Sequence, residues 1–401
     1  MRSSWQNTWR QNPGSKHSRN HYERDCISEM TDAIHQAVAR YKYRVLFCFI
    51  LLFDLCACSN DHEAEQSSAQ GNNQDWQTVS LPDISHQPIK LRVARVLNPR
   101  FAQLSDDNIR QLLQRTQQLV KQHFDIDVEF SQITTLPVED VFAAINPQVI
   151  TQRSAEIVSL DLIDDNAREA MQQAVFATLS HYSGNKQNVI DFAQPYLLHP
   201  EIKQNDFIGL SYALVDTLIS RLSYWKTQKA ADGKPVLDSN VFHQWVWWDS
   251  LGYSNLSYDV LITNQLVASA EYYGMDVHSS IRGGLTAGTT SYNKNTPFSA
   301  FVYIMLYPML NNSEMMTMLR QDENYNDEQI INYSAALLTH ELGHLLLHLG
   351  HPFGNKHCIM SPTTMLNYRD WYSHLDAGLC AIGSSPAMTP GAAKIDYNRR
   401  W

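Results

Sequence analysis

The sequence predicts a mixed fold of the α/β (α+β) class, in which a sheet-containing body carries a helical insertion. The pattern opens as strand, helix and strand, and it continues with mostly helical segments. It then returns to apolar segments rich in β-forming residues, followed by a long apolar helix. The chain has 401 residues, of which 44% are hydrophobic, so it can bury a substantial core.

The first three elements of the folded body are predicted from the alternation of apolar and polar residues and from a helix-capping residue. The segment KLRVARVL, from Lys90, alternates as a strand does. The segment SDDNIRQLLQRTQQLVKQHF, from Ser105, starts with a capping residue and continues with helical apolar spacing. DIDVEF, from Asp125, alternates again. We therefore expect a strand, a helix and a second strand at the start of the folded body.

Residues from about 138 to 229 carry mostly helical patterns, among them NAREAMQQAVFATLSHY and GLSYALVDTLISRLSYW. We expect these segments to form an inserted helical subdomain. The cluster FHQWVWWD that follows, from Phe242 to Asp249, is more typical of a buried aromatic patch than of a cleft lining.

The segments SYDVLITNQLVAS, from Ser257, and FSAFVYIMLYP, from Phe298, have the composition of sheet strands. Between them, RGGLTAGTTSYN, from Arg282, is rich in glycine and threonine. It lacks the spacings of phosphate-binding loops, so its glycines predict tight turns.

The N-terminal region has the order of a secretory signal. A basic stretch, RYKYR from Arg40, precedes the apolar run from Val45 to Phe53 and the segment LCAC that ends at Cys58. LCAC resembles the lipobox of bacterial lipoproteins, in which cleavage precedes an acylated cysteine. The alternative, a transmembrane anchor, needs roughly 20 apolar residues, and this run is far shorter.

The resulting division of the chain has three parts. We expect a signal peptide over residues 1–58, with translation starting at Met30 as a further hypothesis, and a polar tether over 59–77. A single domain then covers 78–401, with the helical insertion at about 138–229 and a zinc-binding core at about 257–401. A lipid anchor at Cys58 places the protein in the bacterial cell envelope, on the periplasmic side of the outer membrane in a Gram-negative host. The net charge of −10 argues against a nucleic-acid partner.

The candidate chemistry lies in one long helix that starts at Asn326 or Asp327. It carries His340, Glu341 and His344 within an apolar stretch. Imidazoles four residues apart share a helix face and can bind one zinc ion. Glu341 can then take a proton from the metal-bound water. The alternative is a hydrogen-bonded core cluster without metal.

A catalytic zinc site usually has three protein ligands, so a third must lie downstream. Gly350 can end the helix, and His351 follows it directly. His357 is the alternative third ligand, and a carboxylate such as Asp376 is another.

These motifs resemble the metzincin clan of zinc peptidases, and most closely the archaemetzincins. That family carries HExxHxxGxxH, a cysteine, a Cys-x-Met turn and a later CxxC that helps to bind a second zinc. Here HELGH at His340–His344 is followed by Gly350 and His351, by CIM at Cys358–Met360, and by Cys380. The resemblance implies a twisted mixed sheet with an active-site helix, and a Met-turn at Met360.

The resemblance also implies that a tyrosine after the Met-turn stabilises the oxyanion, for which Tyr368 is the candidate, with a packed core tyrosine as the alternative. The chain departs from the family at Leu347, where a glycine is expected, and at Phe353 and Gly383, where cysteines are expected. The second zinc site is therefore depleted.

The remaining two cysteines, Cys358 and Cys380, are better explained as a disulfide in an exported protein, with two buried free thiols as the alternative.

Taken together, the sequence predicts a membrane-tethered zinc peptidase that holds one Zn²⁺ ion and acts on a peptide or protein substrate. The alternative function is a non-catalytic scaffold or binding protein with a structural zinc site. A gluzincin-like site using Asp370 or Asp376 ranks lower, because NYRDWYSHLDAG has no clear helical pattern.

Overall fold

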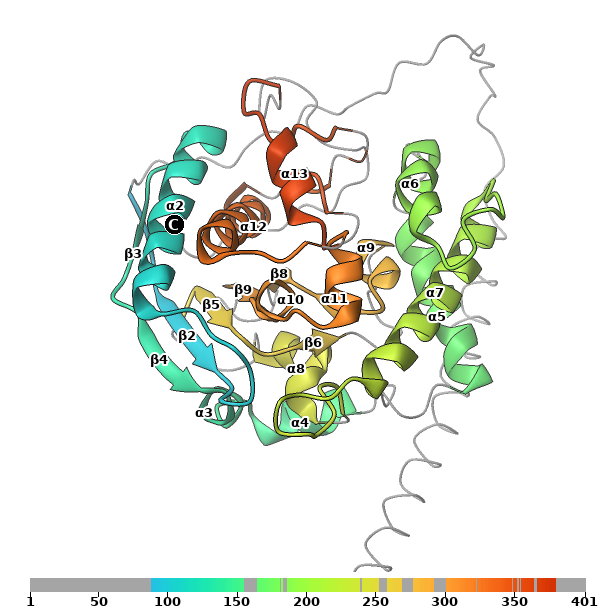
Figure 1. Cartoon of the computed structure of the whole chain (residues 1–401), viewed down its shortest axis with the longest axis horizontal. Helices are drawn as coiled ribbons and strands as arrows, with labels where there is room; N and C mark the ends of the chain where they lie inside the picture. Colours follow the sequence, from blue (N-terminus) through green and yellow to red (C-terminus); the bar gives the residue numbers. More distant parts are fainter. Residues whose placement is uncertain are drawn as a thin grey trace, which may run out of the picture. The chain divides into compact units, whose positions relative to one another are not determined.

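A five-stranded sheet forms the centre of the computed structural model (Figure 1). Its strand order is β4 (Thr134–Pro137), β2 (Val93–Leu97), β5 (Val260–Thr263), β9 (Phe301–Met305) and β8 (Gly288–Ser291). The first four strands are parallel, and β8 pairs antiparallel with β9 at the end of this order. The prediction of a mixed α/β fold is therefore confirmed, and the sheet is itself mixed.

The structure describes residues 88–154, 164–180, 182, 186–238, 240–251, 258–268, 277–291, 301–321, 323–347, 349–351, 353, 355–363 and 366–379. The expected signal peptide, the lipidation residue Cys58 and the tether lie outside these residues, and so does Cys380. Within the described residues, none of the helices combines the length and apolar character needed to cross a membrane.

Successive residues of the central strands point to two different hydrophobic layers. In β5, Val260 and Ile262 belong to one layer and Leu261 to the other; in β9, Val302 alternates with Tyr303 in the same way. This alternation follows from the period of two in a strand. Because helices cover both faces, the strands are apolar at nearly every position.

Helices α2 (Asp106–Phe124) and α12 (Asp327–Leu347) pack together on one face of the sheet, and α3 (Val138–Phe142) and α8 (Trp245–Ser250) lie on the other (Figure 1). Helix α2 starts where its sequence predicts, because the side chain of Ser105 accepts a hydrogen bond from the backbone of Asn108 at 3.1 Å. The aromatic cluster at α8 is buried against β5 and β9, as expected.

The helical insertion begins with α3 and α4 (Pro147–Ser154). It continues through α5 (Asp165–Ser180), α6 (Lys186–Ala193), the short η2 (Gln194–Tyr196) and α7 (Phe207–Thr227). Helix α7 packs against α5 and also against α9 (Val277–Ile281), which follows the central strand β5 in the chain. The insertion thus reaches a segment of the sheet-containing body.

The remaining elements are short. They are β1 (Ile89–Leu91), β3 (Val128–Phe130), β6 (Val267–Ala268), β7 (Leu285–Thr286), η3 (Val241–His243), α10 (Tyr307–Leu310), α11 (Glu314–Leu319) and α13 (Tyr368–His374). Strands β1 and β3 form a parallel pair, and β6 and β7 form an antiparallel pair.

Three sequence-based expectations need correction. KLRVARVL is two strands, β1 and β2, because the backbone N–H of Arg92 between them donates to a carboxylate oxygen of Asp259 at 2.8 Å. RGGLTAGTTSYN contains strands β7 and β8 besides its turn. NYRDWYSHLDAG contains helix α13, in which Asn367 caps the first turn by accepting from the backbone of Asp370 at 3.1 Å.

Candidate metal site

Helix α12 presents two histidines one turn apart. Its start is fixed by a reciprocal cap: the backbone of Gln329 donates to Oδ1 of Asn326 at 2.9 Å, and the backbone of Asn326 donates to Oε1 of Gln329 at 3.0 Å. Most of the helix is buried between α2 and the sheet. His340 and His344, four residues apart, therefore share one face of a rigid, buried element.

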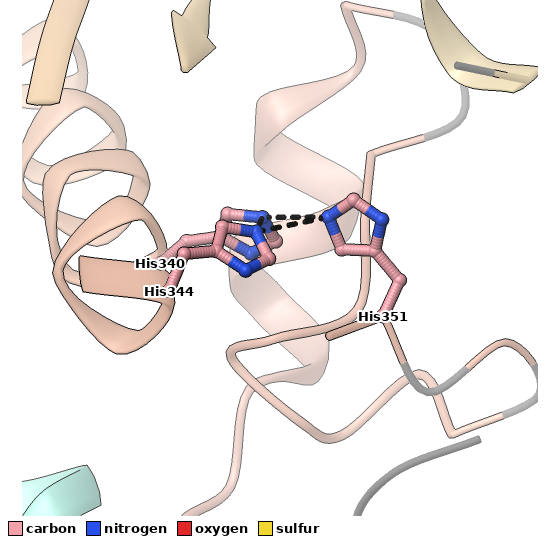
Figure 2. Close-up of side chains that lie close together, drawn as sticks. All are labelled: His340, His344 and His351. Atoms are coloured by element: carbon pink, nitrogen blue, oxygen red, sulfur yellow. Dashed lines mark hydrogen bonds between the residues drawn. The ribbon is translucent and has the colours of Figure 1, made fainter. Parts of the chain in front are cut away.

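The chain reverses after α12 and returns His351 toward the two helical histidines (Figure 2). The helix ends at Leu347, three residues before the glycine at which the sequence predicted its end. The backbone N–H of Leu349 donates to the carbonyl of Gly343 at 3.3 Å and closes the turn. The turn after Leu347 therefore has room to bring His351 back to the helix.

The Nε2 atoms of the three rings converge on one point. The Nε2 atom of His344 lies 3.1 Å from that of His340 and 3.1 Å from that of His351, and the remaining pair is 3.2 Å apart. Dashed lines in Figure 2 join these atoms. The three nitrogens thus form a nearly equilateral triangle.

The hydrogen bonds made by the Nδ1 atoms determine which nitrogen of each ring carries the proton. Nδ1 of His340 donates to the carbonyl of Ile359 at 2.8 Å, and Nδ1 of His344 donates to the carbonyl of Leu349 at 2.5 Å. A carbonyl only accepts, so the proton of each neutral ring is on Nδ1. Two Nε2 lone pairs therefore face each other at 3.1 Å without a proton between them.

The environment keeps these rings neutral. Burial lowers the pKa of His340 to about 3 and that of His344 to about 4, and it lowers the pKa of His351 well below its usual value. Neighbouring imidazoles add to the effect at His340 and His351, and so does the charge of Arg282. Metal ligands must be unprotonated, so the rings are ready to bind at neutral pH.

The triangle fits a metal ion. A tetrahedral ion with metal–nitrogen bonds of about 2.0–2.1 Å holds its nitrogens about 3.3–3.4 Å apart, close to the spacing found here. Ring nitrogens that donate to backbone carbonyls are also the usual outer partners of metal-binding histidines. His340, His344 and His351 can therefore hold a metal ion.

The alternative ligands do not join this group within the described residues. His357 turns its Nδ1 to the carbonyl of His374, at 2.9 Å. Asp370 and Asp376 lie on or just after α13 and are also outside the group. The structure thus brings together His340, His344 and His351, the three histidines that the sequence analysis favoured as metal ligands.

Glu341 is buried, and its carboxylate lies against the edge strand β8. Oγ1 of Thr290 is 2.9 Å from both Oε2 and the backbone oxygen of Glu341, and it donates its single hydrogen to one of them at a time. A Cβ atom at Gly288 would come within 2.8 Å of Oε1. The strand therefore needs a glycine here, which the sequence assigned to a tight turn.

Met360 lies beneath the turn of α12 that carries the histidines. It is fully buried, and a Cβ atom on Gly343 would come within 2.3 Å of its Sδ atom and 2.8 Å of Cζ of Phe124. The residue before it, Ile359, is the one whose carbonyl orients His340. The position thus suits the Met-turn that the resemblance implies.

Tyr368 starts α13 and is fully buried, and its hydroxyl interacts with the side chain of Arg282. Burial raises the pKa of Tyr368 to about 12; the nearby charge of Arg282 opposes this shift and that of Glu341 adds to it. The tyrosine is therefore a protonated donor close to both charged groups at neutral pH.

Two further residues singled out in the sequence, Phe353 and Cys358, lie after His351. Phe353 is buried with its ring edge-on to Tyr182 and Phe192 of the insertion, at centroid distances of 5.1 and 5.0 Å. Cys358 is disulfide-bonded, and its partner lies outside the described residues. The pairing with Cys380 stays a prediction.

A cleft of about 390 Å³ lies between the insertion and the segment after Met360. Trp371 contributes to its wall, and the Trp371 ring is 6.3 Å from that of His340. Phe192 and Tyr196 of the insertion line the opposite part, together with the segment Ser361–Thr363. The insertion and the segment after Met360 thus enclose one cleft.

Sequence reasoning missed several residues around the histidines. His278 and Arg282 lie on or next to α9, and Thr290 lies on β8. None of them belongs to a recognisable motif, and only their tertiary placement reveals them. The glycine-rich character of the segment that begins at Arg282 was the one signal in the sequence.

Comparisons of the chain with protein-family models, with curated proteins and with solved structures give no match. The interpretation of the site therefore rests on its own geometry.

A substitution at Gly343 tests the packing beneath the histidines. Gly343→Ala should lower the free energy of unfolding by about 1–3 kcal/mol, because the new Cβ overlaps Met360 and Phe124. Gly209→Ala on α7 is the matched control, since its nearest neighbour is the end of the flexible Gln204 side chain. Chemical denaturation of both variants measures the difference; equal stabilities would contradict the packing.

The histidines also predict a pH dependence for the metal-free protein. Their pKa values are lowered on folding, so between pH about 6.5 and 4 the unfolded chain binds protons that the folded chain does not. The contribution of the neutral histidines to the free energy of unfolding should therefore reach its maximum above pH 6.5 and decrease as the pH is lowered. His344→Gln should flatten this slope by about 1 kcal/mol per pH unit. An unchanged slope in denaturation curves from pH 6 to 4.5 would show that His344 is not buried in its neutral form.

Proposed function

We propose that this protein is a zinc-dependent peptidase. The observation that carries the proposal is the convergence of three neutral imidazole nitrogens, two of them from the helix that also carries the buried Glu341. The resemblance of HELGH, His351 and CIM to the metzincin clan supports the same conclusion. Glu341 follows His340 directly, so the proposed base and two of the three proposed metal ligands share one rigid element.

Zinc is the metal that best suits this donor set. It commonly takes neutral imidazole nitrogens in tetrahedral geometry, and catalytic zinc sites combine three protein ligands with a water. The bound ion would polarise the substrate carbonyl and lower the pKa of a water molecule. The three histidines in the described residues leave a fourth tetrahedral position for that purpose.

The residues then perform hydrolysis as follows. The Glu341 carboxylate takes a proton from water while the water oxygen bonds to the carbonyl carbon. The carbon–nitrogen bond breaks as the carboxyl group passes this proton to the leaving amine. Thr290 and the close approach of Gly288 hold the carboxylate in place. Tyr368, protonated and buried, is the candidate donor to the oxygen that becomes negative.

The substrate would lie as an extended strand beside β8. This strand ends the described sheet, and an edge strand can pair with an extended peptide through its backbone. The cleft bounded by Trp371 would take a side chain of the substrate. Its wall combines aromatic rings such as those of Phe192 and Tyr196 with polar and charged side chains.

The alternative is a non-catalytic scaffold whose zinc site is structural. It needs a fourth protein ligand, and His348 and His357 are the nearest histidines in the sequence that could supply it. His357 lies outside the group, and His348 lies outside the described residues. Binding of a hydroxamate to the zinc-loaded protein separates the two functions, because only an open coordination position accepts it.

The role of Glu341 has a direct test. Glu341→Gln should retain zinc and lose hydrolysis of a peptide library by at least about 100-fold, because the amide cannot accept the proton. Glu328→Gln, an exposed residue in the first turn of the same helix, is the matched control and should keep full activity. Zinc content and cleavage are measured on the same preparations. Undiminished cleavage by Glu341→Gln would refute the assignment of the base.

We further propose that the protein is tethered to a membrane of the bacterial cell envelope by a lipid on Cys58. The support is the order of basic stretch, apolar run and LCAC in the sequence. Mass spectrometry of the mature protein should find an acylated N-terminal Cys58, and Cys58→Ser should abolish acylation and release the protein from membranes. A mature N-terminus at another residue would contradict the proposal.

A further inference from the structure

The helical insertion fixes α9, the short helix that borders the histidines. The half-buried guanidinium of Arg221, on α7, donates to the carbonyl of Ile281 and, at 2.9 Å, to that of Tyr196. Nε1 of Trp225 donates to the carbonyl of Arg282 at 3.4 Å. Gly283 follows with φ of 72°, and a Cβ there would come within 2.6 Å of the Arg221 side chain. The insertion thus holds the end of α9 by close packing and hydrogen bonds.

His278, on α9, is a fourth histidine at the metal site. Its ring meets that of His351 edge-on, with centroids 5.1 Å apart and an interplanar angle of 83°. It lies outside the triangle of ligand nitrogens. His278 is therefore not a fourth ligand in this structure. It is close enough to the three histidines to contact a molecule bound between them.

The Nδ1 atom of His278 is buried and has no hydrogen-bond partner among the described residues. Leaving such an atom unsatisfied is costly, and buried polar groups in native proteins almost always have partners. A buried ring nitrogen without a partner beside the candidate metal site therefore indicates a hydrogen bond that a ligand completes.

The surroundings indicate what that ligand carries. Nε of Arg282 donates to the carbonyl of His278 at 3.0 Å, and the charge of Arg282 lies close to the imidazoles of the site. The buried hydroxyl of Tyr368 is a second donor group on this side of the site, and it interacts with the side chain of Arg282. Donors and positive charge on this side of the site favour a negatively charged oxygen.

We propose that His278 is a substrate-contacting residue, whose Nδ1–H donates to a negatively charged oxygen of a peptide bound at the metal site. The proposal rests on the proposed peptidase function. The oxygen has two sources, the scissile carbonyl oxygen after water has added to its carbon, or the terminal carboxylate of the peptide. In this arrangement the helical insertion serves the reaction by holding α9 and its histidine in place.

Equilibrium binding tests the contact without relying on turnover. The probe is phenylphosphonate, an anion, titrated calorimetrically into the zinc-loaded protein, with imidazole as a neutral metal ligand for comparison. His278→Leu should weaken phosphonate binding about tenfold and leave imidazole and zinc affinities unchanged. His278→Asn should restore most of the loss, because its amide nitrogen lies near the place of Nδ1. His199→Leu, an exposed histidine of the insertion, is the control.

Two results would overturn the proposal. One is phosphonate binding by His278→Leu that equals that of the unaltered protein. The other is an equal loss of zinc and phosphonate affinity, which would show that His278 only supports His351.

Kinetics with peptides that have a free or an amidated C-terminus then distinguish the two oxygens. A fall in kcat that is the same for both peptides identifies the scissile carbonyl oxygen. A rise in KM confined to the free acid identifies the terminal carboxylate. If no peptide is hydrolysed, the peptidase function fails, while the phosphonate titration still decides whether His278 contacts an anion.

Discussion

The two hydrogen bonds from ring nitrogens to backbone carbonyls are the interactions on which this site depends. His340 donates to Ile359 and His344 donates to Leu349, so both protons are directed away from the centre of the site. The lone pairs that remain converge at 3.1 Å, a repulsive arrangement unless a cation lies between them. Neutral rings in this geometry are therefore most stable as metal ligands, and the rest of the fold serves to hold them there.

The fold constrains these bonds from several sides. Helix α12 is buried between α2 and the sheet, so its histidines cannot turn toward solvent. The antiparallel edge strand β8 lies against Glu341, and Met360 fills the space below Gly343. The insertion adds Phe192, which packs on Phe353, and Arg221, which fixes α9. The histidines and Glu341 come from short segments of the chain, but elements far apart in the sequence are needed to hold them in place.

The sequence predicts the part of the site that follows local rules. The spacing of His340, Glu341 and His344 is a property of one helix, and the reversal that returns His351 needs only a few more residues. The class of fold follows in the same way from periodicity. Helix α12 ends at Leu347, and the reversal that follows it brings His351 back to the two helical histidines.

Other features depend on tertiary contacts that no local pattern contains. Gly288 is needed because Glu341 approaches it from another segment, and His278 reaches His351 only through the packing of α7 on α9. Helix α13 was missed because its apolar residues are few, although Asn367 provides a cap. Strand β2 is separated from β1 by the Arg92–Asp259 contact, which joins residues far apart in the sequence.

Zinc K-edge X-ray absorption of the purified, zinc-loaded protein tests the central claim most directly. The geometry predicts one zinc ion per chain with three imidazole nitrogens at about 2.0–2.1 Å, a light-atom fourth ligand and no sulfur. Failure to bind zinc, or a shell of sulfur at about 2.3 Å, would contradict the assignment of His340, His344 and His351 as the metal ligands.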